Sequence, residues 1–253
     1  MTGPPSPREV GPIEVLTRSA LRRGLPFVVR GLARGWPASR WTQSELRKRF
    51  GASEVTSYRI EKGELRFDRK TGLIPERLPL AQALDRAATH RVRSRIEDEL
   101  PALAREVRVP EACEGRLRLE LNLWISGARV RSRLHYDQPE NLLVQIEGTK
   151  RVTLFAPSQA KFLYPNPITS TIAQFSRVDL AAPDASRFPR LARAQAWRTT
   201  IAPADAVFIP GRWWHYVEAD EPTISLGIRW WRARHLPRLI AADLYKCLRG
   251  QVR

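Results

Sequence analysis

Residues 117–123 read Leu117-Arg118-Leu119-Glu120-Leu121-Asn122-Leu123, with leucine at every second position. Side chains of a β-strand point alternately to the two faces of the sheet, so this repeat predicts a half-buried strand. Further strand-like runs lie at 141–146, 151–155, 197–201, 206–209, 215–218 and 223–231, with turn sequences between them. Many short strands joined by turns predict a mainly β protein, a barrel or sandwich with a core over about residues 117–231.

The segments outside this core are expected to be a tail and two helical flanks. Residues 1–12 are rich in Pro and Gly and are expected to form a flexible tail, which leaves 13–253 as a single domain. Leucine and isoleucine spacing predicts a C-terminal helix at about 236–249. That helix is expected to pack on the barrel or on a second subunit, which would make a homodimer.

N-terminal to the core, the run from Trp41 to Phe50 is expected to be a helix. Thr42 is a good N-cap, Glu45 completes a capping box and Gly51 ends the pattern. Charged residues dominate 91–108, which is expected to be a solvated helix or loop.

The chain is strongly basic, with a formal net charge of +17 and 43 Lys and Arg residues. This charge favours an anionic partner such as RNA or a ribosome. However, only six of the 43 basic residues are Lys, and such a skew toward Arg is also what a GC-rich genome produces without selection for binding. Both interpretations stay open at this stage.

Two cysteines, Cys113 and Cys247, are too few for a disulfide framework and favour a reducing compartment. The sequence contains neither a run of about 18 apolar residues nor the basic-then-apolar order of a signal peptide. We therefore expect a cytoplasmic protein with no membrane partner.

Candidate metal ligands are His135 and Asp137, which flank Tyr136, and the distant His215. Positions i and i+2 of a strand face the same side, so His135 and Asp137 can converge on one ion. An isolated triplet of this kind is common by chance, and a histidine beside tryptophans is often a core residue. Structural zinc would need four ligands, usually with Cys. Two imidazoles and one carboxylate with the other positions open instead indicate a non-haem Fe(II) oxygenase.

At this point the chain resembles the JmjC-type, cupin-like oxygenases, which use Fe(II) and 2-oxoglutarate and include the asparaginyl and arginyl protein hydroxylases. The resemblance runs from about Pro26 to Trp231. It implies a double-stranded β-helix, also called a jelly-roll or cupin barrel, with flanking N-terminal helices. It rests on these ordered blocks: Pro26-Phe27-Val28-Val29-Arg30-Gly31-Leu32-Ala33-Arg34-Gly35-Trp36-Pro37, Asn122-Leu123-Trp124-Ile125, Leu134-His135-Tyr136-Asp137, Phe162-Leu163-Tyr164-Pro165, Arg177-Val178-Asp179-Leu180, Phe208-Ile209-Pro210, Trp214-His215 and Trp230-Trp231.

The resemblance also implies a binding site for 2-oxoglutarate. Lys150, Asn141 and Ser132 stand at the positions that bind this cosubstrate in the family. A lysine in an apolar barrel would supply the charge for the distal carboxylate, and a hydroxyl would share that load. For each residue, an ordinary place in a turn, strand or loop is the alternative.

Three further positions are assigned by the same resemblance. His90 stands where several relatives carry a Tyr that reaches the distal carboxylate, and it could donate a hydrogen bond in its place. Arg229 stands where relatives carry Asn or Ser, and it would add positive charge beside the metal if it points into the barrel. Trp124 is expected to line the substrate pocket, although an aromatic on a barrel strand can equally be core.

The expected function is that of an Fe(II)- and 2-oxoglutarate-dependent dioxygenase that uses O2 to hydroxylate a protein side chain of the Arg or Asn type. The expected partner is therefore a protein or peptide. One alternative keeps this chemistry and directs it at tRNA, other RNA or a small metabolite. Another alternative is a non-catalytic cupin-like binding module. Demethylation begins with the same hydroxylation and stays open.

Overall fold

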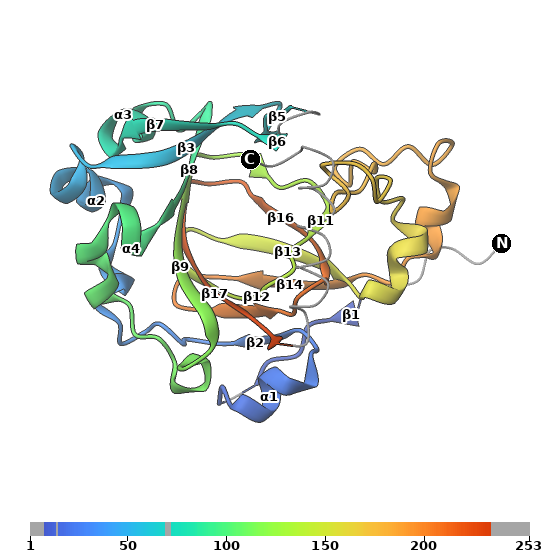
Figure 1. The fold of residues 1–253 in the computed structure, drawn as a ribbon, viewed down its shortest axis with the longest axis horizontal. Helices are drawn as coiled ribbons and strands as arrows, with labels where there is room; N and C mark the ends of the chain where they lie inside the picture. Colours follow the sequence, from blue (N-terminus) through green and yellow to red (C-terminus); the bar gives the residue numbers. More distant parts are fainter. Residues whose placement is uncertain (1–7, 14, 69–71, 234–253) are drawn as a thin grey trace.

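The structure is a computed structural model that describes residues 8–13, 15–68 and 72–233. Its core consists of two β-sheets that face each other (Figure 1). The smaller sheet contains, in spatial order, β1 (Arg8–Glu9), β14 (Trp197–Ile201), β13 (Lys150–Phe155), β16 (Trp214–Ala219) and β10 (Val130–Arg131), and β11 (His135–Tyr136) also pairs with β16.

The larger sheet wraps around one side of the smaller one. In spatial order it contains β2 (Phe27–Val29), β15 (Ala206–Ile209), β12 (Glu140–Glu147), β17 (Thr223–Trp231), β9 (Leu117–Ser126), β8 (His90–Arg95), β3 (Glu54–Glu61) and β4 (Glu64–Leu65), and β7 (Pro75–Pro79) pairs with β3. A separate pair joins β5 (Phe67–Asp68) to β6 (Gly72–Leu73). Neighbouring strands of the larger sheet are antiparallel, so the predicted mainly β, cupin-like jelly-roll is confirmed.

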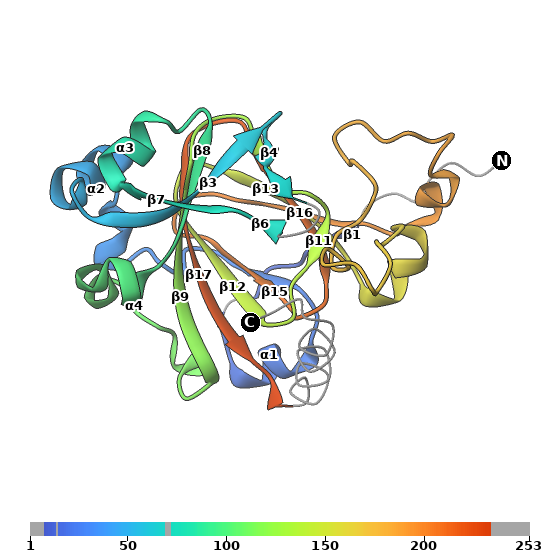
Figure 2. The same ribbon diagram turned by 45° about the horizontal axis from the view of Figure 1, so that its top comes forward.

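Short helices flank the two sheets. The α-helices are α1 (Arg18–Arg23), α2 (Gln43–Phe50), α3 (Leu80–Asp85) and α4 (Ile96–Glu99). The 3-10 helices are η1 (Pro37–Arg40), η2 (Pro101–Glu106), η3 (Glu111–Cys113), η4 (Pro157–Phe162) and η5 (Pro189–Arg193). Most of the helices cover the outer face of the larger sheet, whereas η4 and η5 pack beside the smaller one. Figure 2 places α2, α3 and α4 beyond β8 and β9, on the side away from the excursion that carries η4.

The predicted N-cap of α2 forms, but the predicted capping box does not, because the carboxylate of Glu45 contacts Arg49 instead of the backbone of Thr42. Thr42 has an extended backbone, and its hydroxyl accepts a hydrogen bond from the backbone N–H of Glu45 at 3.1 Å. Such a cap satisfies one of the free N–H groups at a helix start. Leu46, on the next turn, is fully buried against the sheet, which contributes about 2 kcal/mol to folding.

Alternation along the central strands separates an outer apolar face from an inner, more polar one. On β9, Leu123 and Ile125 join the outer core beneath the helices, whereas Trp124 faces the barrel interior. On β17, Leu226 packs outward while its neighbour Ser225 is hydrogen-bonded inside. The interior contains a second apolar cluster and, beside it, the polar groups of the candidate site.

Two expectations about the flanks are wrong, and one lies outside the described residues. The tail does not extend to residue 12, because β1 pairs parallel to β14 and Val10 is buried. Residues 91–95 are a central strand, β8, rather than a solvated helix or loop. The predicted C-terminal helix at about 236–249, and a homodimer formed through it, lie outside the described residues. In the part of the chain that is described, no helix is long and apolar enough to cross a membrane.

Candidate metal centre

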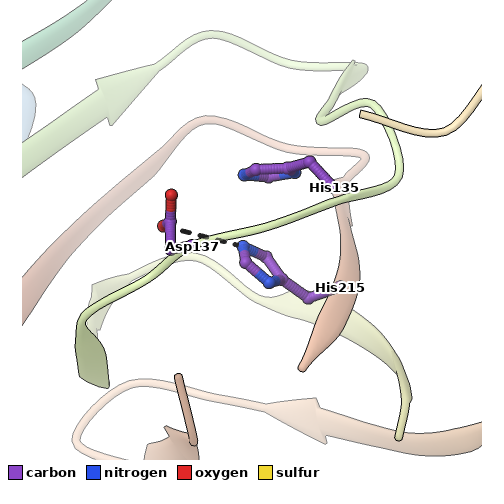
Figure 3. Close-up of side chains that lie close together, drawn as sticks. All are labelled: His135, Asp137 and His215. Carbon is purple, nitrogen blue, oxygen red and sulfur yellow. Dashed lines mark ion pairs between the residues drawn. The ribbon is translucent and has the colours of Figure 1, made fainter. Parts of the chain in front are cut away.

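Two histidines and an aspartate meet at one end of the barrel. His135 on β11 lies directly opposite His215 on β16 in strand register, and the centroids of the two rings are 4.1 Å apart. Asp137 follows β11, and its Oδ2 is 3.9 Å from Nε2 of His215. One ligand atom from each residue lies within 4.8 Å of the other two, and Figure 3 shows the three side chains gathered around one point. The predicted ligands therefore come together.

Two backbone carbonyls fix the orientation of the imidazoles. Nδ1 of His135 is 2.7 Å from the carbonyl oxygen of Arg133, and Nδ1 of His215 is 3.0 Å from that of Trp213. A carbonyl only accepts hydrogen bonds, so Nδ1 donates in both rings and Nε2 keeps its lone pair. This second hydrogen bond is the usual means of orienting a metal-binding histidine.

Burial and one arginine set the charges of the three groups. Burial, reinforced by His215, lowers the pKa of His135 to about 3, and burial also lowers the pKa of His215. Burial opposes ionisation of Asp137, but Arg229 and the two imidazoles hold the pKa of this carboxyl well below its usual range. Neutral imidazoles and an ionised carboxylate are the forms that bind a divalent metal. The donor set fits the two-histidine, one-carboxylate arrangement of Fe(II) oxygenases.

Arg229 does point into the barrel. Its Nη2 is 3.3 Å from Oδ2 of Asp137, and its side chain is 10% exposed. It is the cross-strand partner of Asn141 on β12, which lies at the edge of the same site.

A cavity of about 310 Å³ lies beside the ligands. Trp124, Ser132, Asn141 and Lys150, all predicted from the sequence, line it. Lys150 is buried and donates a hydrogen bond to the hydroxyl of Ser225. Burial, together with nearby Arg91, holds the pKa of Lys150 well below its usual range.

The polar groups of this cavity suit a small dianion. Among the described residues, no carboxylate lies within ion-pair distance of Lys150, and a buried cation without a counterion is unfavourable. Nε1 of Trp124 is buried without an acceptor among the described residues, so this N–H is left to donate to an anion. The hydroxyl of Ser132 accepts from the backbone N–H of Val217, so its own proton is left to donate. These residues fit a bound 2-oxoglutarate.

The assignment of His90 to the cosubstrate is corrected by the structure. His90 is buried on the outer face of β8, 2.9 Å from the hydroxyl of Thr89 and 3.3 Å from the carboxylate of Glu76, and it does not line the cavity. Two arginines of the same strand, Arg91 and Arg93, line the cavity instead. Both arginines were missed. The signal was present in Arg91-Val92-Arg93-Ser94-Arg95, which alternates like a strand.

A jelly-roll barrel with two histidines and an aspartate at one end defines a cupin-type protein with a candidate metal centre. The chain belongs to the cupin-like domain family, whose model matches residues 12–235. The JmjC-type, cupin-like resemblance seen in the sequence is thus confirmed.

The chain is similar to curated proteins whose names indicate different activities. Lysine-specific demethylase JMJ31 from Arabidopsis thaliana is 34% identical over 142 residues, which is 55% of this chain and 26% of that protein. Jumonji C domain-containing protein 5 from Drosophila melanogaster is 31% identical over 138 residues, 53% of this chain and 34% of that protein. tRNA wybutosine-synthesizing protein 5 from Gallus gallus is 28% identical over 247 residues, 88% of this chain and 75% of that protein. The chain thus spans only 26% and 34% of the length of the first two.

Proposed function

We propose that this protein is an Fe(II)- and 2-oxoglutarate-dependent dioxygenase that hydroxylates a side chain of a protein substrate. One observation carries the proposal. The two neutral imidazoles and the ionised carboxylate of the triad line a cavity that also contains Lys150, which is buried and has no carboxylate partner among the described residues. A cupin-like binding module without turnover would need neither the triad nor the lysine.

In this proposal His135, Asp137 and His215 hold Fe(II), and Lys150 binds the distal carboxylate of 2-oxoglutarate. Bound iron and cosubstrate supply the oxidising chemistry, in which a C–H bond, 2-oxoglutarate and O2 give a C–OH group, succinate and CO2. Two electrons come from the C–H bond and two from 2-oxoglutarate; one oxygen atom of O2 ends in the C–OH group and the other in the new carboxylate of succinate, while CO2 keeps the oxygens of the carboxylate that leaves 2-oxoglutarate.

The protein supplies orientation and a water-poor pocket. Asn141 and Ser132 offer polar groups to the cosubstrate, and Arg91 stands beside Lys150 where His90 was expected to help. Phe175 stacks on His135 with ring centroids 5.2 Å apart, and Trp124 also lines the cavity. These apolar faces exclude water and so strengthen the electrostatic contacts within.

A protein side chain is the first choice of substrate, and within the two types expected from the sequence an Asn-type group suits the cavity better than Arg. The lining contains four basic residues, Arg91, Arg93, Arg133 and Lys150, and one acidic residue, Asp137. A cationic side chain would be repelled there.

RNA is the second candidate, for a specific reason. The wybutosine-synthesizing relative aligns over 88% of this chain, further than the demethylase from Arabidopsis thaliana. The net charge of +17 also suits a nucleic-acid partner. Salt-dependent RNA binding with a steep slope would support this candidate.

The proposal is tested first by binding, so that no substrate is needed. Calorimetry of the Mn(II)-loaded protein should show binding of 2-oxoglutarate, which Lys150→Ala should weaken at least about tenfold because a charge-assisted contact is lost. Arg91→Gln should weaken it less. His90→Gln is the matched control, since His90 lies outside the cavity.

Turnover is tested next. Fe(II)-dependent formation of succinate from 2-oxoglutarate should occur in the wild type and be lost in His135→Ala and Asp137→Ala. If loaded wild-type protein bound no 2-oxoglutarate, the proposed function would be wrong.

A further inference from the structure

Two arginines from β8 add charge to the cavity that neither the metal nor the cosubstrate requires. Arg91 and Arg93 alternate with Val92, so both point from the larger sheet into the barrel and line the cavity. Arg93 is the cross-strand partner of Trp124, whose indole forms part of the same wall. They occupy the interior face of the sheet.

Neither guanidinium has an acidic partner among the described residues. The nearest aromatic contact is that of Arg91, which lies 6.0 Å from the ring centre of Trp124. Burial, with the like charge of Arg93, lowers the pKa of Arg91 to about 10. Arg133, a third cation of the lining, already faces Glu64 at 3.8 Å. Arg91 and Arg93 therefore carry charge that a bound anion would stabilise.

Strand register separates the two arginines by depth. Arg91 lies opposite Ser126 on β9, and Ser126 lies opposite Thr223 at the start of β17. Arg229, which contacts Asp137, lies near the other end of β17, so Arg91 is far from the metal centre along the strand direction. It lies near enough to Lys150 to lower that pKa.

Arg93 lies one level nearer the metal centre, about 6–7 Å along the strand from Arg91. Arg93 lines the same cavity as His135 and Asp137. Lys150 and Arg91 together can serve the distal carboxylate of 2-oxoglutarate. Arg93 is then left for another anion close to the reacting centre.

We propose that the substrate presents a carboxylate to Arg93, so that the enzyme selects an acidic group over neutral and basic ones. This proposal rests on the proposed function. A guanidinium binds a carboxylate through two parallel hydrogen bonds, which fixes orientation as well as charge. The carboxylate comes from an acidic side chain of a polypeptide or from a small free acid.

Cavity size favours a carboxylate over a phosphodiester. A volume of about 310 Å³ is at the small end for ligand sites, and the cosubstrate shares it. A carboxylate is a terminal group that enters such a space alone. A phosphodiester carries a sugar on each side and would bring two nucleosides with it.

The test compares three substrate sources. Fe(II)-loaded protein with 2-oxoglutarate and O2 is incubated separately with synthetic peptides whose central residue is Asp, Glu, Asn, Gln, Lys or Arg between randomised flanks, with the small-metabolite fraction of a cell extract, and with its RNA fraction. Mass spectrometry detects the addition of one oxygen atom. We expect product from acidic-centre peptides or from free carboxylic acids, at least about tenfold above Lys and Arg peptides.

Three variants connect this selection to Arg93. Arg93→Gln should lower the ratio of acidic to neutral product about tenfold, and Arg93→Lys should retain part of it because the charge stays. Arg93→Glu should shift the preference toward Lys and Arg. Arg95→Gln is the matched control, because Arg95 is on the same strand but exposed beside Asp98. Thermal melts confirm that each variant folds.

Several results would overturn the proposal. They are preferential oxidation of basic or neutral peptides, product confined to the RNA fraction, an unchanged ratio in Arg93→Gln, or no product in any fraction while 2-oxoglutarate still binds. Failure of the proposed function has a different signature, since the Mn(II)-loaded wild type would then bind no 2-oxoglutarate.

Discussion

Arg229 on β17 places Nη2 3.3 Å from Oδ2 of Asp137, so the carboxylate of the candidate metal centre has a fixed cation as well as two imidazoles beside it. The contact is largely shielded, with the Arg229 side chain 10% and the Asp137 side chain 28% exposed. Arg229 therefore stabilises the charge of Asp137 before any metal binds.

Arg229→Gln should destabilise the metal-free protein by about 2 kcal/mol, because it leaves a largely buried carboxylate without its cation. Urea unfolding in EDTA measures this cost. Saturating Mn(II) should restore most of the difference, since the ion replaces the missing charge. An equal cost with and without Mn(II) would show that Arg229 does not act through Asp137.

Mn(II) should stabilise the wild type by about 2.7 kcal/mol when its concentration is 100 times the dissociation constant. The gain should vanish in His135→Ala, Asp137→Ala and His215→Ala, because each change removes a ligand. Thermal or urea unfolding with and without metal gives the value. His90→Gln should keep the full gain, and loss of the gain in that variant would count against the assigned site.

Gly227→Ala should weaken 2-oxoglutarate binding about tenfold, or about 1.4 kcal/mol, through local overpacking. A Cβ at Gly227 would lie 3.1 Å from Oδ1 of Asn141 and 3.5 Å from the ring of Trp124, two groups that line the cavity. Calorimetry on the Mn(II)-loaded protein measures the change. Gly11→Ala is a suitable control, since a Cβ there meets nothing within 4 Å. Unchanged affinity in Gly227→Ala would exclude Asn141 and Trp124 from the binding site.

Glu106 should make stability depend on acid pH. It accepts a hydrogen bond from Nε1 of Trp41 at 2.6 Å and pairs with Arg49, whose hydrogen bond is the main cause of the lowered pKa of Glu106. A lowered folded-state pKa contributes stability that is present above the unfolded pKa of about 4.3 and is lost as pH falls through the folded value.

Glu106→Gln should therefore cost about 1 kcal/mol at pH 7, a modest value because Arg49 is partly exposed. The difference from wild type should shrink as pH falls below about 4. Urea unfolding across this pH range measures both. A difference that stays constant with pH would mean that the ionised form of Glu106 is not responsible.

Two strands of the larger sheet were predictable from their apolar residues. The run at 223–231 coincides with β17, and the run at 206–209 coincides with β15. The resemblance to the JmjC-type oxygenases implied that Lys150 and Asn141 serve one cosubstrate, and both residues line the same cavity. Local alternation and spacing survive folding unchanged, so they can be recognised without a structure.

The charged strand β8 was not predictable in the same way. Its alternation shows which residues share a face, but not whether that face meets solvent or the interior of a barrel. Arg91 and Arg93 resemble surface residues until β9 is known to pair beside them. His90 was assigned to the cavity for the same reason, since a shift of one residue moves a side chain to the other face. The register between two strands that are distant in the sequence is set by tertiary packing, so the sequence alone does not show which face of β8 lies inside the barrel.

His135 and His215 face each other on a single rung between β11 and β16, and β11 is only two residues long. A metal ion bound between these two side chains would link the two strands and so stabilise the pairing of the short strand β11. Trypsin cleaves after Arg, so we expect metal binding to slow cleavage after Arg131 and Arg133, just upstream of β11. The resistance of the protein to proteases would then depend on the supply of the metal that this site binds.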